Sequence, residues 1–121
     1  MTVGYIVFAH GSRVESANQA VRTVAADFAR SAAFSHVEAA FLELGVPNLE
    51  GAADRLVAQG AKRIVVIPYF LTLGLHMERD LPALVDSISK KHKDISITVT
   101  APLDGHPALV EILKARAAES A

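Results

Sequence analysis

Apolar residues recur along the chain with two spacings that alternate. Runs in which every residue or every second residue is apolar predict β-strands, and these are Val3–Ala9, Val37–Leu44, Ile64–Ile67 and Ile95–Thr100. Apolar residues spaced three and four apart predict amphipathic helices, and these cover residues 14–31, the segment from Pro47-Asn48 to a cap at Gly60, residues 81–91 and the segment after His106-Pro107. The chain therefore consists of strand–helix repeats.

Such repeats are typical of an α/β domain built on a parallel sheet. Right-handed crossover connections place helices on both faces, so we expect a three-layer sandwich around a four-stranded parallel sheet. No linker or low-complexity segment divides the chain, and we expect residues 1–121 to form a single domain. Pro82 is expected in the first turn of the third helix, and Leu109, Ile112 and Leu113 of the last helix are expected to face the core.

Three residues with metal-binding side chains lie where predicted strands end. His10 follows the first strand, where Gly11 permits a sharp turn; Glu43 lies on the second strand, and His76 follows the third and its apolar extension. Ligands of open parallel sheets bind at the carboxyl ends of the strands, where two imidazoles and a carboxylate would suit Fe²⁺, Co²⁺ or Ni²⁺. The spacing alone also fits structural histidines and a solvated Glu43. His106 either caps the last helix or joins this site.

Charge, cysteine content and missing motifs restrict the function further. The 12 basic and 13 acidic residues leave a net charge of −1, so no global field attracts nucleic acid or a membrane surface. The absence of cysteine excludes disulfides, thiolate metal ligands and a thiol nucleophile. Neither a P-loop nor a dinucleotide-binding glycine motif occurs, so we expect no nucleotide. The start has no basic leader and no apolar stretch is long enough to span a membrane, so a cytoplasmic location is expected.

Several short motifs follow one another in a recognisable order. They are Ala9-His10-Gly11-Ser12-Arg13, Ala40-Phe41-Leu42-Glu43-Leu44 with Pro47, Ile67-Pro68-Tyr69-Phe70-Leu71, Gly74-Leu75-His76, Asp80-Leu81-Pro82 and Gly105-His106-Pro107. Together they closely resemble the short form of the CbiX-type sirohydrochlorin chelatases, and the resemblance spans essentially the whole chain. The family motif often has glycine before the histidine, where this chain has Ala9, a change between two small residues.

The resemblance implies an activity, a site and an assembly. Members of this family insert Co²⁺ or Fe²⁺ into the tetrapyrrole sirohydrochlorin without ATP, and close relatives insert Ni²⁺. The family's two metal-site histidines correspond to His10 and His76, and its motif glutamate corresponds to Glu43, which gives all three a catalytic role. Long members hold two such domains in one chain, which implies that two copies of this shorter chain pair as a homodimer.

Metal insertion gives roles to the neighbouring polar residues. Neutral imidazoles hold a divalent ion and accept protons near neutral pH, so the two histidines would bind the metal and take up the pyrrole protons. Arg13 and Arg79 are candidates to pair with the carboxylates of the substrate, with surface ion pairs as the alternative. Ser12 is a candidate substrate contact whose hydroxyl also suits a helix cap.

The run Leu71-Thr72-Leu73-Gly74-Leu75 is apolar sequence at the expected site edge. Exposed apolar patches mark binding surfaces more often than solvated loops. Leu73 and Leu75 are therefore expected to form a wall for the macrocycle or a contact between subunits.

Two other functions remain as alternatives from the sequence. Histidine phosphatases place an arginine directly before the histidine that follows their first strand, and Ala9 removes the group that would hold phosphate. A non-catalytic metal-binding or metal-carrier module would use the same histidines, and only a turnover assay separates it from an enzyme.

Overall fold

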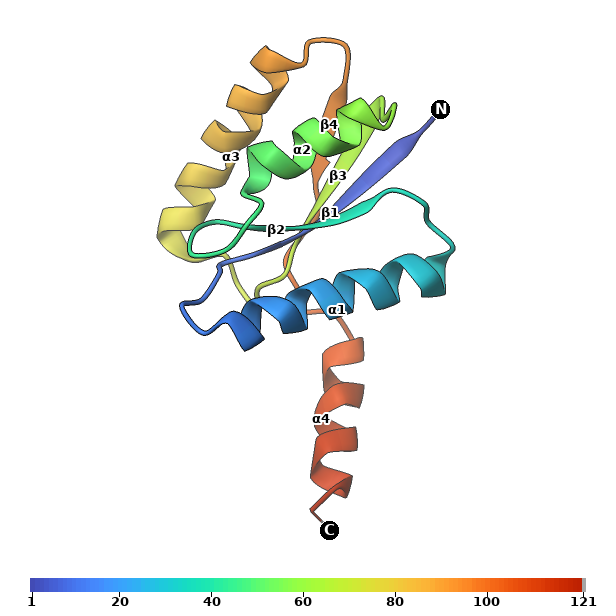
Figure 1. Ribbon diagram of the computed structural model, residues 1–121. Helices are drawn as coiled ribbons and strands as arrows, with labels where there is room; N and C mark the ends of the chain where they lie inside the picture. The colour runs from blue at the N-terminus through green and yellow to red at the C-terminus, as the bar shows by residue number, and fades with distance from the viewer. Residues whose placement is uncertain (121) are drawn as a thin grey trace.

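The computed structural model describes residues 1–120, which form one parallel sheet and its connecting helices (Figure 1). In chain order the elements are β1 (Val3–Ala9), α1 (Glu15–Ala32), β2 (Val37–Phe41), α2 (Leu49–Ala58), β3 (Arg63–Pro68), α3 (Gly74–Lys91), β4 (Ser96–Val99) and α4 (Ala108–Ala118). The strands lie in the order β2-β1-β3-β4, and all three pairs are parallel. The predicted strand–helix alternation and parallel sheet are confirmed.

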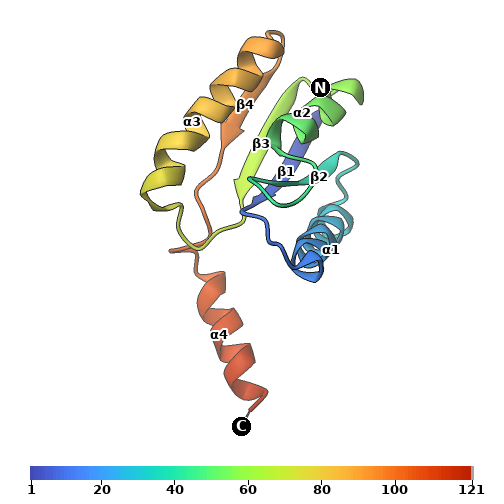
Figure 2. The ribbon, with the colours of Figure 1, turned by 60° about the vertical axis from the view of Figure 1, so that its left-hand side comes forward.

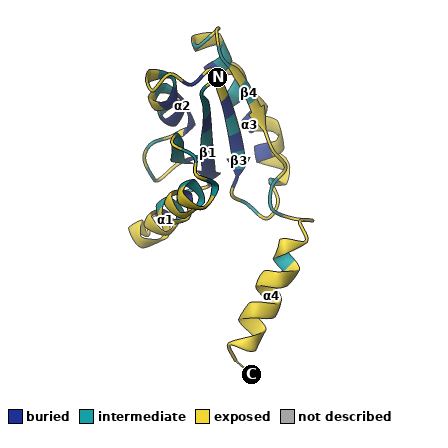
Figure 3. Ribbon diagram, turned by 90° about the vertical axis from the view of Figure 1, so that its right-hand side faces the viewer, coloured by how far each residue is buried: buried dark blue, intermediate teal, exposed yellow. Residues whose placement is uncertain are grey.

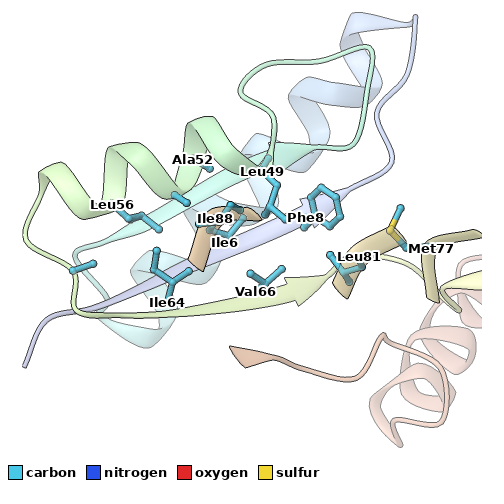
Figure 4. Packing of buried hydrophobic residues seen from close by; sticks show 13 residues of the cluster. Ile6, Phe8, Leu49, Ala52, Leu56, Ile64, Val66, Met77, Leu81 and Ile88 are labelled. Carbon is cyan, nitrogen blue, oxygen red and sulfur yellow. The ribbon is translucent and has the colours of Figure 1, made fainter. Parts of the chain in front are cut away.

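Helices cover both faces of the sheet. The chain moves from β1 to β2 in one direction and from β2 through β3 to β4 in the other, so right-handed crossovers place α1 on one face and α2 with α3 on the opposite face (Figure 1). The main core lies on the side of α2 and α3, where Ile6 and Phe8 of β1 meet Leu56 and Leu81 (Figure 4). Complete burial of such side chains contributes roughly 1.5–3 kcal/mol each.

The third helix begins earlier than its pattern predicted. It starts at Gly74 rather than at residue 81, and Pro82 lies in the helix interior instead of the first turn. Met77 and Leu81 are both buried, so the inward face of the helix already forms before the proline. His76 consequently lies in the first turn of α3 and not at the end of a strand extension.

The second strand ends before its predicted boundary. β2 stops at Phe41, and Leu44, where the strand was predicted to end, takes a backbone φ of +59° that is incompatible with an extended strand. Glu43 therefore lies in the loop after β2 and not on the strand. Its backbone N–H still donates to the His10 carbonyl at 3.1 Å, so the loop continues to follow the end of β1.

The prediction that the last helix packs on the core is wrong. Within the described chain α4 has no buried residue, and Ile112 and Leu113 are 52% and 69% exposed. Figures 2 and 3 show α4 extending away from the sheet. The physical reason is the preceding segment, in which Leu103 N–H donates to the Phe70 carbonyl at 2.9 Å and directs the chain outward from the carboxyl edge.

The start of α4 carries the cap expected of His106. Its Nδ1 accepts a hydrogen bond from the backbone N–H of Ala108 at 3.0 Å, which satisfies one free donor of the first helical turn. Among the residues described, no helix combines the length and the apolar character needed to cross a membrane.

Candidate metal and substrate site

The loops that follow β1 and β2 touch each other backbone to backbone. Gly11 has a φ of +94°, and a Cβ placed there would lie 1.7 Å from the Glu43 carbonyl oxygen. Only glycine combines this backbone conformation with such a close approach. The contact brings two candidate residues together, with His10 Nε2 3.9 Å from Glu43 Oε1.

Both side chains of this pair face solvent. The His10 and Glu43 side chains are 60% and 58% exposed, so each is accessible to an ion or a ligand. Nδ1 of His10 lies 3.3 Å from the Gly11 carbonyl oxygen, and a proton on Nδ1 leaves the Nε2 lone pair free. An ion held at Nε2 would have the negatively charged Glu43 carboxylate beside it.

His76 shares a cavity with His10. The cavity has a volume of about 250 Å³, and both imidazoles line it. The other lining residues are Leu42, Phe70, Leu73, Gly74, Leu75, Met77 and Asp80. The Phe70 ring stands edge-on to His10 with centroids 6.5 Å apart, and the side chains of Phe70, Leu73 and Leu75 form the apolar wall of the cavity.

The predicted site residues are thus gathered at one edge, but they do not form a closed metal centre. Within residues 1–120, no group of three or more His, Cys, Asp or Glu side chains is arranged to hold an ion. His10 and Glu43 form a close pair, while His76 lies elsewhere on the cavity wall. An ion bound by so few ligands keeps open coordination positions.

The two candidate arginines are on the surface near the histidines. Arg79 donates from Nε to Asp80 Oδ1 at 3.0 Å, and its Nη2 lies 3.5 Å from His76 Nδ1. Arg79 therefore forms the surface ion pair that was its alternative role. Arg13 is exposed. The Ser12 hydroxyl accepts from the backbone N–H of Val14 at 3.0 Å, which makes it part of the turn that leads into α1.

The apolar run after β3 divides into exposed and packed positions. Leu71 and Leu75 are 63% and 85% exposed, and Leu75 also lines the cavity. Leu73 turns inward and packs against the core, so the expectation that the whole run is exposed is wrong at this position. The inward turn of Leu73 directly precedes the first residue of α3, whose inward face it joins.

Asn18 is a site-adjacent residue that the sequence pattern did not single out. It is 1% exposed, and its side chain bonds to both loops of the site. The available signal was its spacing on the inward face of α1, where Val21, Ala25 and Phe28 follow it at helical intervals. Nearby, a hydrogen bond from Arg22 lowers the pKa of the Glu15 carboxyl, and one from Asn18 lowers it further.

A family model described as CbiX matches residues 4–120. The chain belongs to the CbiX family. This CbiX protein is 33% identical over 115 residues to a sirohydrochlorin cobaltochelatase of Sulfolobus acidocaldarius, covering 95% of this chain and 89% of the relative. It is 36% identical over 113 residues to a chloroplastic sirohydrochlorin ferrochelatase of Arabidopsis thaliana, which covers 93% of this chain but only 50% of the plant protein. The chain thus spans about half the length of that relative.

Solved structures share the fold of this CbiX protein. A CbiX protein from Marinobacter aquaeolei VT8, described as a putative cobalamin biosynthesis protein, superposes with a TM-score of 0.86 at 25% identity and covers 98% of this chain and 96% of its own. A sirohydrochlorin chelatase, SirB, from Bacillus subtilis subspecies spizizenii in complex with cobalt gives a TM-score of 0.78 at 28% identity, covering 84% and 44%. The predicted family and the predicted α/β fold are both confirmed.

Proposed function

We propose that this CbiX protein inserts a divalent metal ion, Co²⁺ or Fe²⁺, into sirohydrochlorin. The observation that carries the proposal is the pairing of His10 with Glu43 at 3.9 Å on a cavity that His76 also lines. Relatives of similar length are named sirohydrochlorin cobaltochelatases, and the longer plant relative is named a ferrochelatase. The metal ion is a substrate of this reaction, and no nucleotide takes part.

The proposed chemistry needs an ion that is bound and then released. His10 and His76 take the ion from water, and their small number leaves it free to move onto the four pyrrole nitrogens. Two pyrrole protons leave the macrocycle as the metal enters. Each of the two histidines has a free lone pair once it has given up the metal, so His10 and His76 accept one of these protons each. The Glu43 carboxylate, beside His10 Nε2, assists as a ligand, a proton acceptor or a guide for the metal ion.

The macrocycle lies against the apolar wall of the cavity. Leu73 and Leu75 contact its face, while Arg13 and Arg79 pair with its carboxylates. Ser12 contacts the substrate from the loop after β1, the loop that also carries Arg13. Arg79 must leave Asp80 to pair with a substrate carboxylate. Both members of that pair are largely exposed, and such pairs contribute about 1 kcal/mol or less, so the exchange of partners costs little.

Two copies of the chain form the working unit. The cavity is open on one side, and a planar tetrapyrrole needs a wall on each of its faces. Leu75 at the cavity mouth and Leu113 on α4 are 85% and 69% exposed. A two-fold pair covers the same apolar patches on both copies. Each copy is a single domain, and the assembly works in the cytoplasm without nucleic acid or a membrane.

A metallation assay tests the proposed function. Purified protein is mixed with sirohydrochlorin and Co²⁺, Fe²⁺ or Ni²⁺ in turn, and insertion is followed by the change in tetrapyrrole absorbance. We expect rates well above the uncatalysed reaction, and loss of at least about 100-fold in His10→Ala, as is usual for a group that binds and transfers protons. His36→Ala is the matched control, because His36 bonds to Gln59 and lies outside the cavity.

The same assay separates the enzyme from a metal carrier. A carrier binds Co²⁺ through the exposed His10 and Glu43 but accelerates nothing beyond one equivalent of metal per chain. Binding without multiple turnovers, or a His10→Ala variant with normal turnover, would refute the proposed activity.

A further inference from the structure

Asn18 lies in the first turn of α1 and is fully buried, with 1% of its surface exposed. Burial of a carboxamide is unfavourable unless its donors and acceptor find partners. The groups that form short hydrogen bonds with the Asn18 side chain lie outside α1. They belong to the two loops that carry His10 and Glu43, which follow different strands.

The carboxamide makes three short hydrogen bonds. Its Oδ1 accepts from the Ser12 backbone N–H at 2.9 Å, and its Nδ2 donates to the Ser12 carbonyl and to the Leu44 carbonyl, each at 2.9 Å. A longer contact joins Nδ2 to Glu15 Oε2 at 3.4 Å. One amide group therefore joins the loop after β1 to the loop after β2, and no other residue type offers this set of donors and acceptor at that length.

The loop after β2 is shaped around this amide. Leu44 takes a left-handed φ of +59°, which places its carbonyl against Asn18. Gly45 follows, and a Cβ there would lie 2.8 Å from Phe41 Cγ and 3.2 Å from Asn18 Nδ2. The backbone thus passes so close to the amide that a side chain at this position does not fit without movement.

The site residues lie between two points of attachment. On the strand side, Leu42 N–H donates to the Ala9 carbonyl at 2.9 Å, which extends the pairing of β2 with β1. On the helix side, Asn18 joins the two loops again. His10 and Glu43 lie in between, where the Glu43 N–H also donates to the His10 carbonyl at 3.1 Å. Asn18 holds the outer side of this pair of loops, so the 3.9 Å separation of the two side chains depends on the amide as well.

We propose that Asn18 is a positioning residue that keeps His10 and Glu43 side by side for metal transfer, an inference that rests on the proposed function. Asn18 acts from behind the site and contacts neither side chain. Loss of its amide frees the loop after β2 to move relative to the loop after β1, while the sheet and the apolar wall keep their places.

The first test compares two variants on the same face of α1. Asn18→Ala removes the bridging amide, and Ala25→Gly weakens a buried position two turns further along without touching either loop. We expect both to lower the melting temperature. Only Asn18→Ala is expected to lower kcat for metallation, by about 10-fold or more, with KM for sirohydrochlorin changed less than about 3-fold. Equal kcat values in the two variants would show a purely structural role and overturn the proposal.

A double-mutant cycle asks whether Asn18 acts through Glu43. Glu43→Gln and Asn18→Ala are measured alone and combined. If Asn18 works by placing the carboxylate, the combined variant is no more than slightly slower than the slower single variant. Multiplication of the two losses contradicts the inference.

Binding of Co²⁺ without tetrapyrrole keeps this inference separate from the proposed function. The titration is followed by the visible absorption of the bound ion, with His10→Ala as the negative control. We expect Asn18→Ala to bind Co²⁺ at least about 10-fold more weakly than Ala25→Gly, and this holds as a test even if the wild-type protein does not metallate sirohydrochlorin. Equal affinities overturn the inference. Asn18→Ser replaces Asn18→Ala in each experiment if the alanine variant does not fold.

Discussion

Gly11 lies where the loop after β1 meets the loop after β2, with its φ at +94°. Its missing side chain matters for two separate reasons, since a Cβ would strain the backbone and would also overlap the Glu43 carbonyl oxygen at 1.7 Å. Gly60, just after α2, has nearly the same φ of +98° but nothing within 4 Å of a built Cβ. A side chain at Gly60 would therefore cost backbone strain alone, whereas a side chain at Gly11 would cost backbone strain and steric overlap.

Replacement of Gly11 by alanine is expected to damage both stability and the site. Gly60→Ala measures the strain of the left-handed backbone alone, about 1–2 kcal/mol of unfolding free energy, and should retain full metallation. Gly11→Ala adds the displacement of the second loop, roughly 1–3 kcal/mol more, and should lose most activity because Glu43 moves away from His10. Urea denaturation and the metallation assay report the two effects, and similar behaviour of the two variants would contradict the role given to the close contact.

At the scale of the elements, α2 and α3 are joined by a polar cluster at one end. Asp54 of α2 accepts from His92 Nε2 at 2.7 Å and from Lys91 Nζ at 2.9 Å. The hydrogen bond from His92, followed by that from Lys91, lowers the pKa of the Asp54 carboxyl. Because the folded-state pKa is below the unfolded value, this stabilisation is complete above the unfolded pKa of about 3.9 and is lost as the pH falls towards the folded one.

Asp54→Asn should therefore cost stability at neutral pH and little in acid. The Asp54 side chain is 39% exposed and screened by solvent, so we expect a loss of about 1 kcal/mol or less near pH 7 that shrinks as the pH falls below about 4. Urea denaturation at a series of pH values measures it. Asp27→Asn removes an exposed pair with Arg30 inside α1 and serves as the control, since it joins no two elements. A difference between wild type and Asp54→Asn that grows in acid would reverse the assigned sign.

The helices and strands that could be predicted are those whose apolar residues all pack in the same way. β1, α1 and α2 match their predicted extents closely because their apolar spacing reflects a single packed face. α3 was predicted to start too late because Pro82 suggested a first turn, while Met77 shows that the inward face begins earlier. The error at α4 is of a different kind. Apolar residues such as Ile112 were expected to pack on the core of this chain, but the pattern does not say what covers such a surface, and Ile112 is exposed.

The site shows the same division. The sequence correctly places His10 directly after β1, and His10 and His76 line one cavity, although His76 lies in the first turn of α3 rather than at the end of a strand extension. Their role in metal binding stays a prediction. Glu43 was placed in the right neighbourhood but on a strand rather than in a loop. Asn18 could not be predicted because it bonds to backbone groups of two loops. Every residue has these backbone groups, so the sequence does not show which of them a side chain will bind.

At the scale of the whole molecule, large apolar side chains are exposed on α4, the helix that projects from the sheet. The exposed large apolar residues include Leu75, which lines the cavity, and Val110, Ile112 and Leu113 on α4. Figure 3 shows α4 exposed along almost its whole length. Apolar surface of this kind is unfavourable in water, and the proposed pairing of two copies would remove it from water.

Sedimentation of the wild-type protein at micromolar concentration should show a species of twice the chain mass. Leu113→Glu places a charge on the apolar surface of α4 and should weaken association by about 10-fold or more, through the unfavourable burial of an unpaired carboxylate. Thr23→Glu adds the same charge to the exposed side of α1 and should leave the mass unchanged. A fully active monomer would rule out the pair.

The 11 residues of α4 also set a thermodynamic condition on such an association. Helices shorter than about 12–15 residues are marginally stable alone in water, because nucleation fixes several residues for one hydrogen bond. In a chain without a partner, α4 is therefore in equilibrium between helix and coil. Packing of a second copy against α4 would shift this equilibrium to the helix. Assembly then becomes a coupled folding and binding event, in which part of the binding free energy is spent on helix formation and the affinity is lower than the buried area alone would suggest.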